Sequence, residues 1–254
     1  MNVTIVQADL HWHDPAANRA LFEAQIDALR QPTDLIVLPE MFATGFTMDA
    51  VTYAESMDGA SMRWLATMAA RSRSAICGSL IIKERDRYYN RFVYMQADGA
   101  FTCYDKRHLF RLADEQQHYT AGSDRVVFEH NGFRICPMVC YDLRFPVWSR
   151  SKGDYDLLIY VANWPSRRHH AWTTLLMARA IENQCYVVGV NRTGTDGNDL
   201  PYSGGSAIID YLGHEIVTLQ DRIACASADI DLAGLARFRE RFPFHVDADS
   251  FELG

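Results

Sequence analysis

The sequence predicts an α/β or α+β protein that folds as one domain over residues 1–254. Segments with the two-residue period of a strand alternate with segments of helical period along nearly the whole chain. Hydrophobic residues make up 48% of the chain and charged residues 22%, which is ordinary for a globular protein with a full core. We find no linker, low-complexity tract or short repeat in the sequence.

The N-terminal part begins with a strand at "VTIVQADL" (residues 3–10) and continues into a helix. Asp14 is a typical N-cap, Pro15 suits a first helical turn, and apolar residues follow at helical spacing at Phe22, Ile26 and Leu29. The next predicted elements are a buried strand, "DLIVLPE" (34–40), and a helix over residues 60–72.

The middle of the chain is rich in predicted strands. The sequence "ADGA" (97–100) is a turn, and "NG" (131–132) predicts a tight hairpin. The predicted strands are "SAICGSLIIKE" (74–84), "RYYNRFVYMQ" (87–96), "FTCYDKRHL" (101–109), "RVVFEH" (125–130) and "FRICPMVC" (133–140).

The C-terminal part alternates strands with helices and ends in a polar tail. The predicted elements are a buried strand "DLLIYVANW" (156–164), a helix over 169–184, a strand "CYVVGVNR" (185–192), a hairpin over 204–219 around Leu212-Gly213, and a helix over 232–242.

Charge and hydropathy exclude several classes of partner. The net charge of −7, spread along the chain, argues against nucleic acid and anionic membranes as main partners. No apolar run approaches the ~20 residues that span a bilayer. The N-terminus "MNVTIVQADL" is typical of a strand and not of a signal peptide, so we expect a cytoplasmic protein.

Six cysteines lie at positions 77, 103, 136, 140, 185 and 225, without C-x-x-C spacing. This pattern predicts neither a metal site nor a disulfide framework. In a reducing compartment, most of these thiols should be free and buried.

Three ionisable residues end apolar strands. They are Glu40 after "LIVLP", Lys106 after "FTCYD" and Cys140 after "RICPMV". Because ligands of α/β sheets gather at the carboxyl ends of strands, these side chains are candidates for one site.

Together, the three groups suit covalent hydrolysis. A thiol with a pKa near ~8.5 needs a base, and the carboxylate of Glu40 can serve. The Lys106 ammonium and the N–H of Tyr141 can stabilise the oxyanion that forms when the thiolate attacks a carbonyl, and water then hydrolyses the thioester. His108 and His170 are alternative bases, and a strand would point His108 the same way as Lys106. We prefer Glu40, because the sequence places no Asn or Asp to orient either histidine.

Three segments, "LPEMFATGF", "YDKRHLF" and "CYDLRFP", resemble the signature motifs of the nitrilase superfamily, the carbon–nitrogen hydrolases. "ARAIENQCYVVGVNRTG" and "YSGGSAIID" resemble further stretches of that family. The resemblance implies a four-layer α-β-β-α sandwich, a catalytic triad of Glu40, Lys106 and Cys140, and a second glutamate, Glu115, that orients Lys106. The alternative for Glu115 is a solvated loop carboxylate.

One position departs from the family pattern. Many relatives have Glu after "RFP", whereas this chain has Val147. Arg144 therefore either forms an ion pair with Asp142, which we favour, or binds a substrate carboxylate through its bidentate fork.

"PEMFATGF" and "CYDLRFPVWSR" are most similar to the omega-amidase branch. That resemblance implies a small amide substrate, a monoamide of a short dicarboxylic acid such as 2-oxoglutaramate or 2-oxosuccinamate. Candidate pocket residues are Phe46, Tyr119, Tyr141, Arg144 and Trp164, although aromatic residues at strand ends can also belong to the core rim. The basic cluster "NWPSRRHH" (163–170) opens a helix and could bind an anion.

Other functions stay open at this point. A nitrilase, an N-carbamoyl amidase and a non-catalytic binding module on the same fold are the alternatives. No cofactor is implied, because thiol, carboxylate and ammonium suffice for the chemistry. Relatives commonly pair, so we expect a homodimer.

Overall fold

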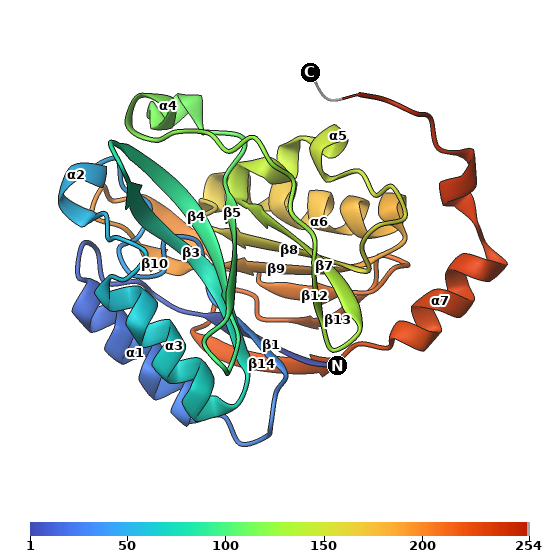
Figure 1. Cartoon of the computed structure of the whole chain (residues 1–254), viewed down its shortest axis with the longest axis horizontal. Coiled ribbons are helices and arrows are strands. Elements are labelled where there is room, and N and C mark those ends of the chain that lie inside the picture. The colour runs from blue at the N-terminus through green and yellow to red at the C-terminus, as the bar shows by residue number, and fades with distance from the viewer. Residues whose placement is uncertain (253–254) are drawn as a thin grey trace.

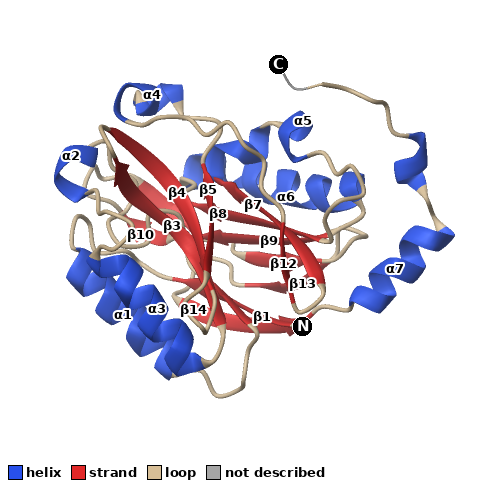
Figure 2. Cartoon of the chain, viewed as in Figure 1, coloured by secondary structure: helices blue, strands red, loops and turns tan. Residues whose placement is uncertain are grey.

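Two six-stranded mixed sheets packed face to face form the centre of the computed structural model, which describes residues 1–252 (Figures 1 and 2). The first sheet has the order β14-β1-β2-β3-β4-β5 and the second β13-β12-β9-β8-β7-β6. The strands of the first sheet are β1 (Asn2–Gln7), β2 (Leu35–Val37), β3 (Ala75–Glu84), β4 (Arg87–Met95), β5 (Phe101–Asp105) and β14 (Ala224–Asp229). Those of the second are β6 (Phe128–His130), β7 (Phe133–Val139), β8 (Leu157–Ala162), β9 (Tyr186–Asn191), β12 (Ala207–Ile209) and β13 (Glu215–Thr218).

Helices cover the outer face of each sheet (Figure 2). Helices α1 (Pro15–Asp27) and α3 (Ala60–Ser72) lie on the first sheet, and α5 (Pro146–Ser149) and α6 (His169–Asn183) lie on the second. The predicted four-layer α-β-β-α sandwich is therefore confirmed. Shorter elements lie in the connections: α2 (Ala50–Tyr53), α4 (Glu115–His118), β10 (Thr193–Thr195), β11 (Pro201–Ser203) and the 3-10 helices η1 (Arg111–Ala113), η2 (Cys140–Arg144) and η3 (Ser166–Arg168).

The alternation of side chains along the strands builds two cores. In β2, Leu35 and Val37 point into the space between the sheets, whereas Ile36 points toward α1 and α3. Successive strand residues face opposite sides of a sheet, so one apolar strand supplies both cores. This explains why the strand sequences are continuous apolar runs.

Several local predictions are confirmed by the backbone. The Asp14 side chain accepts a hydrogen bond from the Ala17 N–H at 2.9 Å, and α3 spans the residues predicted for it. Asn131 and Gly132 have φ angles of 48° and 80°, as a type I′ hairpin turn requires.

Two features differ from the prediction. The strand predicted over 101–109 ends at Asp105, so Lys106 begins a loop and His108 does not share a strand face with it. The sequence analysis also missed β14, which pairs antiparallel with β1. The sequence of β14, "ACASAD", consists of small residues with low strand propensity, and its pairing with β1 decides its conformation.

The C-terminal segment leaves the first sheet after β14 and carries α7 (Leu232–Arg241) and η4 (Phe244–Asp247) around the outside of the molecule (Figure 1). Arg239 fastens α7 to the body, because its guanidinium donates to Asp156 at 2.6 Å, to the Tyr155 carbonyl at 2.8 Å and to the Gln184 carbonyl at 2.8 Å. Within residues 1–252, none of the helices combines the length and apolarity needed to traverse a lipid bilayer.

Candidate active site

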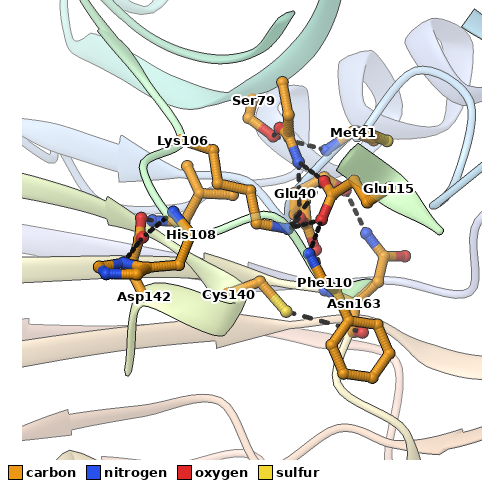
Figure 3. Close-up of polar contacts among 12 residues, drawn as sticks. Glu40, Met41, Ser79, Lys106, His108, Phe110, Glu115, Cys140, Asp142 and Asn163 are labelled. Carbon is orange, nitrogen blue, oxygen red and sulfur yellow. Dashed lines mark hydrogen bonds and ion pairs between the residues drawn. The ribbon is translucent and has the colours of Figure 1, made fainter. Parts of the chain in front are cut away.

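The structure brings Glu40, Lys106, Glu115 and Cys140 together between the two sheets (Figure 3). Glu40 lies in the loop after β2 and Lys106 follows β5, so both come from the first sheet. Cys140 directly follows β7 of the second sheet. Glu115 is the first residue of α4 and is fully buried, so it is not a solvated loop carboxylate.

The Lys106 ammonium lies between two carboxylates. Its Nζ atom is 3.0 Å from Glu40 Oε1 and 2.9 Å from Glu115 Oε2. Burial by itself lowers the pKa of Lys106, but the charges of Glu115 and Glu40 outweigh this effect and raise the pKa above its ordinary value. Lys106 therefore keeps its charge in a buried site, where its electrostatic effect is large.

Glu115 is held from two sides. Its carboxylate accepts hydrogen bonds from Lys106 and from the backbone N–H of Phe110, the latter at 2.5 Å. Burial raises the pKa of Glu115, although the Lys106 charge opposes that shift.

Two asparagines orient Glu40, and the sequence analysis missed both. Asn90 Nδ2 donates to Glu40 Oε1 at 2.7 Å, and the Asn163 N–H donates to Oε2 at 2.8 Å. Asn163 Nδ2 also binds the Glu40 backbone carbonyl at 2.6 Å. The sequence did hold signals for both residues. Asn90 is a polar residue inside a buried strand, and Asn163 is a polar residue just after a strand end, and such buried polar groups need hydrogen-bond partners.

Cys140 has a left-handed backbone conformation, with a φ angle of 43°, at the junction of β7 and η2. Such a conformation is strained for a residue with a side chain and is typical of functional sites. The thiol donates to the Asn163 carbonyl at 3.9 Å. Burial, followed by the Glu40 charge, raises the pKa of Cys140 well above its ordinary value, although Lys106 opposes the shift. The resting thiol is thus protonated, and its reaction needs a base.

A cavity of about 430 Å³ opens onto Cys140 and Lys106. Four of the predicted pocket residues, Phe46, Tyr141, Arg144 and Trp164, line it. The fifth, Tyr119, does not line this cavity. Tyr119 packs with Met41, Ala50 and Ile81 behind the site, and its hydroxyl donates to the Thr47 carbonyl at 2.6 Å.

The favoured ion pair between Arg144 and Asp142 is wrong. Asp142 is bound instead by Tyr104, His108 and the Val139 N–H. The Arg144 guanidinium lies over the Trp164 ring, 4.9 Å from its centroid, and faces the cavity. Among residues 1–252, no carboxylate forms an ion pair with Arg144.

Arg168 adds a second cation to the same wall of the cavity. Its guanidinium lies 5.0 Å from the centroid of the Phe110 ring. Burial, followed by repulsion from Arg167 and Arg144, lowers the pKa of Arg168. In the described part of the chain Arg168 also has no carboxylate in an ion pair, so this corner of the cavity favours an anion.

The histidine alternatives do not face the cavity. His108 Nδ1 lies 2.8 Å from Asp142 Oδ1, and its ring stacks on Phe145 at 3.8 Å. The structure therefore gives His108 an aspartate partner that the sequence analysis did not foresee. Neither His108 nor the exposed His170 lines the cavity, so neither can reach a bound substrate from its present position.

Residues from loops distant in the sequence complete the cavity wall, and no sequence signal marked them. The loop after β1 and the segment around β10 and β11 contribute Trp12, His13, Asp196, Asn198, Leu200 and Tyr202. Over residues 1–252 no group of His, Cys, Asp and Glu side chains has the arrangement of a metal site.

Comparisons with known proteins agree with this geometry. Residues 2–240 match the family described as Carbon-nitrogen hydrolase. The chain is 45% identical to omega-amidase YafV of Escherichia coli K12, over 100% of this chain and 98% of that protein. It is 34% identical to a 2-oxoglutaramate amidase of Bacillus subtilis, with 96% of each chain covered. The fold matches the crystal structure of a CN-hydrolase superfamily protein from Xanthomonas campestris, which has an arsenic adduct in its active site, with a TM-score of 0.98, 46% identity, and coverage of 100% and 99% of the two chains.

Proposed function

Because the chain belongs to the carbon–nitrogen hydrolase family, we propose that it is an omega-amidase that hydrolyses the terminal amide of a short dicarboxylic acid monoamide and releases ammonia. 2-Oxoglutaramate and 2-oxosuccinamate are the substrates we expect. This proposal depends on the position of a thiol, an ammonium and two buried carboxylates beside a cavity. The cavity is also lined by the guanidinium groups of Arg144 and Arg168, which form no ion pair within residues 1–252.

In the proposed reaction, Glu40 accepts the thiol proton as Cys140 Sγ attacks the amide carbon. The carbonyl oxygen becomes an oxyanion, which the Lys106 ammonium and the Tyr141 N–H stabilise. Tyr141 lies in the first turn of η2, where N–H groups lack acceptors within the helix, and this supports its role. When the C–N bond breaks, the proton held by Glu40 passes to the leaving nitrogen and ammonia departs.

The second half of the reaction hydrolyses the thioester on Cys140. Water attacks the thioester carbon while Glu40 takes one of its protons, and the C–S bond breaks as the acid product and the thiol form. The hydrogen bonds from Asn90 and Asn163 support this role, because they hold the Glu40 carboxylate in one orientation through both halves. Glu115 keeps Lys106 charged and oriented.

The far carboxylate of the substrate binds Arg144, with Arg168 as a second cation nearby. A planar guanidinium free of protein carboxylates can bind a substrate carboxylate through two parallel hydrogen bonds. The cavity volume of about 430 Å³ suits a small molecule.

A panel of short amides, nitriles and N-carbamoyl compounds, assayed for ammonia with Cys140→Ala as the blank, tests the proposal. Release of ammonia without carbon dioxide from 2-oxoglutaramate supports it. A preference for nitriles, or equal release of ammonia and carbon dioxide from an N-carbamoyl compound, would favour the other two enzyme classes. No turnover of any compound would favour a binding module.

The choice of base has its own test. Glu40→Gln should abolish turnover. If Glu40→Gln turns over rapidly and His108→Ala is inactive, the base is His108 and our assignment is wrong.

Three further expectations stay predictions: one domain, a cytoplasmic location and assembly as a homodimer. Light scattering after size-exclusion chromatography tests the last of these, with twice the 28.9 kDa chain mass as the expected result.

A further inference from the structure

Asp142 is a fully buried carboxylate two residues after Cys140. An isolated buried carboxylate is strongly destabilising, so its hydrogen bonds show what stabilises it. No arginine or lysine forms an ion pair with Asp142 within residues 1–252. Four hydrogen bonds converge on it instead, two on each oxygen.

The donors come from strand β7 and from two residues in and after strand β5. Oδ2 accepts from the Val139 N–H at 3.0 Å and from the Tyr104 hydroxyl at 2.8 Å. Oδ1 accepts from the backbone N–H of His108 at 2.9 Å and contacts its Nδ1 at 2.8 Å (Figure 3). Each carboxylate oxygen therefore already has two hydrogen-bond partners within the protein, and none of its lone pairs is left for a substrate.

The positions of these donors relate Asp142 to both reactive residues. Tyr104 and His108 lie two residues before and two residues after Lys106. Val139 immediately precedes Cys140. The carboxylate thus joins both sides of the lysine loop, from the first sheet, to the turn that carries the cysteine, from the second sheet.

Further contacts make this connection rigid. The Tyr104 hydroxyl also accepts from Trp148 Nε1 at 3.0 Å, and the His108 ring stacks on Phe145 at 3.8 Å. Asp142 itself does not line the cavity. It therefore makes no contact with a bound substrate and is placed to act through the residues that it holds.

We propose that Asp142 is a positioning residue that sets the distance between the Lys106 ammonium and the Cys140 thiol, an inference that rests on the proposed amidase function. Displacing a reacting group by about 1 Å can lower a rate about 100-fold. In Asp142→Asn, the side-chain NH₂ group would face two donors, because an amide offers only one acceptor oxygen. One pair of hydrogen bonds would be lost, and the lysine loop and the cysteine turn would separate.

Two readouts test this proposal: steady-state kinetics, and the rate at which iodoacetamide alkylates Cys140. For Asp142→Asn we expect kcat to fall about 100-fold with KM within about threefold of the wild-type value. Because a displaced Lys106 would favour the thiolate less, alkylation of Cys140 should slow about tenfold. Rates are expressed per folded molecule, with the folded fraction measured by circular dichroism, so unfolded protein does not contribute.

Asp156→Asn is the matched control. Asp156 is also buried, and its carboxylate is bound by Arg134 and Arg239, away from the cavity. Its loss should lower the melting temperature and leave kcat and the alkylation rate of the folded enzyme unchanged. If Asp142→Asn also leaves kcat and the alkylation rate of the folded enzyme unchanged, the proposal is wrong.

If Asp142→Asn does not fold, His108→Phe tests the positioning role of Asp142 instead. Phenylalanine keeps the stacking on Phe145 and the backbone N–H but removes the Nδ1 contact, so kcat should fall about tenfold at nearly constant KM. An unchanged kcat would refute the proposal. The alkylation rates need no substrate, so they still test the role of Asp142 if the wild-type protein proves inactive on amides and the proposed function fails.

Discussion

Both carboxylate oxygens of Glu115 bind the ammonium of Lys106, at 2.9 and 3.0 Å. The pair is buried, and Lys106 keeps a second carboxylate, Glu40, on its other side. Lys106 is thus shared by two carboxylates, and Glu40 is the one that lies beside Cys140 and can take the thiol proton. Glu115 therefore acts on the reaction through Lys106.

Glu115→Gln should lower kcat about 100-fold with little change in KM. Glutamine keeps the shape of the side chain but loses the charge that orients Lys106 and raises its pKa, so the developing oxyanion is stabilised less well. Steady-state assays of ammonia release measure the effect, with Glu215→Gln, at an exposed position on β13, as the control. Retention of wild-type kcat would show that Glu115 does not contribute.

Arg144→Gln should raise KM for 2-oxoglutaramate and lower kcat/KM about 10- to 100-fold, as expected for the loss of a hydrogen-bonded charge pair. A neutral amide of similar length, such as butyramide, has no carboxylate for Arg144 to bind, so its kcat/KM should change less than about threefold in the variant. Comparing the two substrates on one variant separates recognition from structural damage. Equal losses on both would contradict the assignment of Arg144.

Cys140 should be the first of the six cysteines to react with iodoacetamide, and its rate should rise continuously from pH 7 to pH 9. Cys77, Cys136 and Cys185 are buried, and the partly buried Cys103 and Cys225 do not line the cavity. Cys140 lines the cavity and lies beside Glu40, which can take its proton, so we expect it to react before the other five. The pH dependence follows from the raised pKa of Cys140, since the thiolate fraction still increases across this range. Peptide mapping by mass spectrometry follows each thiol, and a rate that levels off below pH 8 would disagree with the raised pKa.

Arg239→Gln should lower the free energy of unfolding by about 1–3 kcal/mol at pH 7, because it removes charged hydrogen bonds that fasten α7. Burial raises the pKa of Asp156, but Arg134 and Arg239 outweigh it, and the net pKa lies below the ordinary 3.8. A lowered pKa contributes stability above the unfolded value, and this stability is lost as the pH falls through the folded value. The difference between variant and wild type should therefore shrink below about pH 3.8.

Urea unfolding followed by circular dichroism between pH 7 and pH 3 measures this difference. Arg237→Gln is the control on the same helix, because Arg237 is exposed and its contact with Asp231 is long, at 3.5 Å. Its effect should stay within about 0.5 kcal/mol. A similar loss of stability in both variants would argue against a specific role for Arg239.

Much of the fold could be predicted because its signals are local. The Asp14 cap, the helix Ala60–Ser72 and the Asn131-Gly132 turn are each encoded by a few adjacent residues. The family resemblance supplied the four-layer arrangement, and the two sheets with their covering helices confirm it. Strand β14 was missed because its conformation depends on β1, more than two hundred residues away.

The site could be predicted only in part for the same reason. Glu40, Lys106 and Cys140 lie in recognisable motifs, whereas Asn90 and Asn163 acquire their role only when the sheets bring them to Glu40. Sequence proximity suggested that Asp142 pairs with Arg144, but the 3-10 turn of η2 directs the Asp142 carboxylate inward to the lysine loop. Pairing preferences between neighbours cannot reveal such long-range partners.

Each sheet contributes only part of the reactive centre. Glu40 and Lys106 come from the first sheet and Cys140 from the second, so a chain that ends before Cys140 has the base and the cation but lacks the nucleophile. Competence for hydrolysis therefore requires both sheets, because neither sheet alone supplies the base, the cation and the nucleophile.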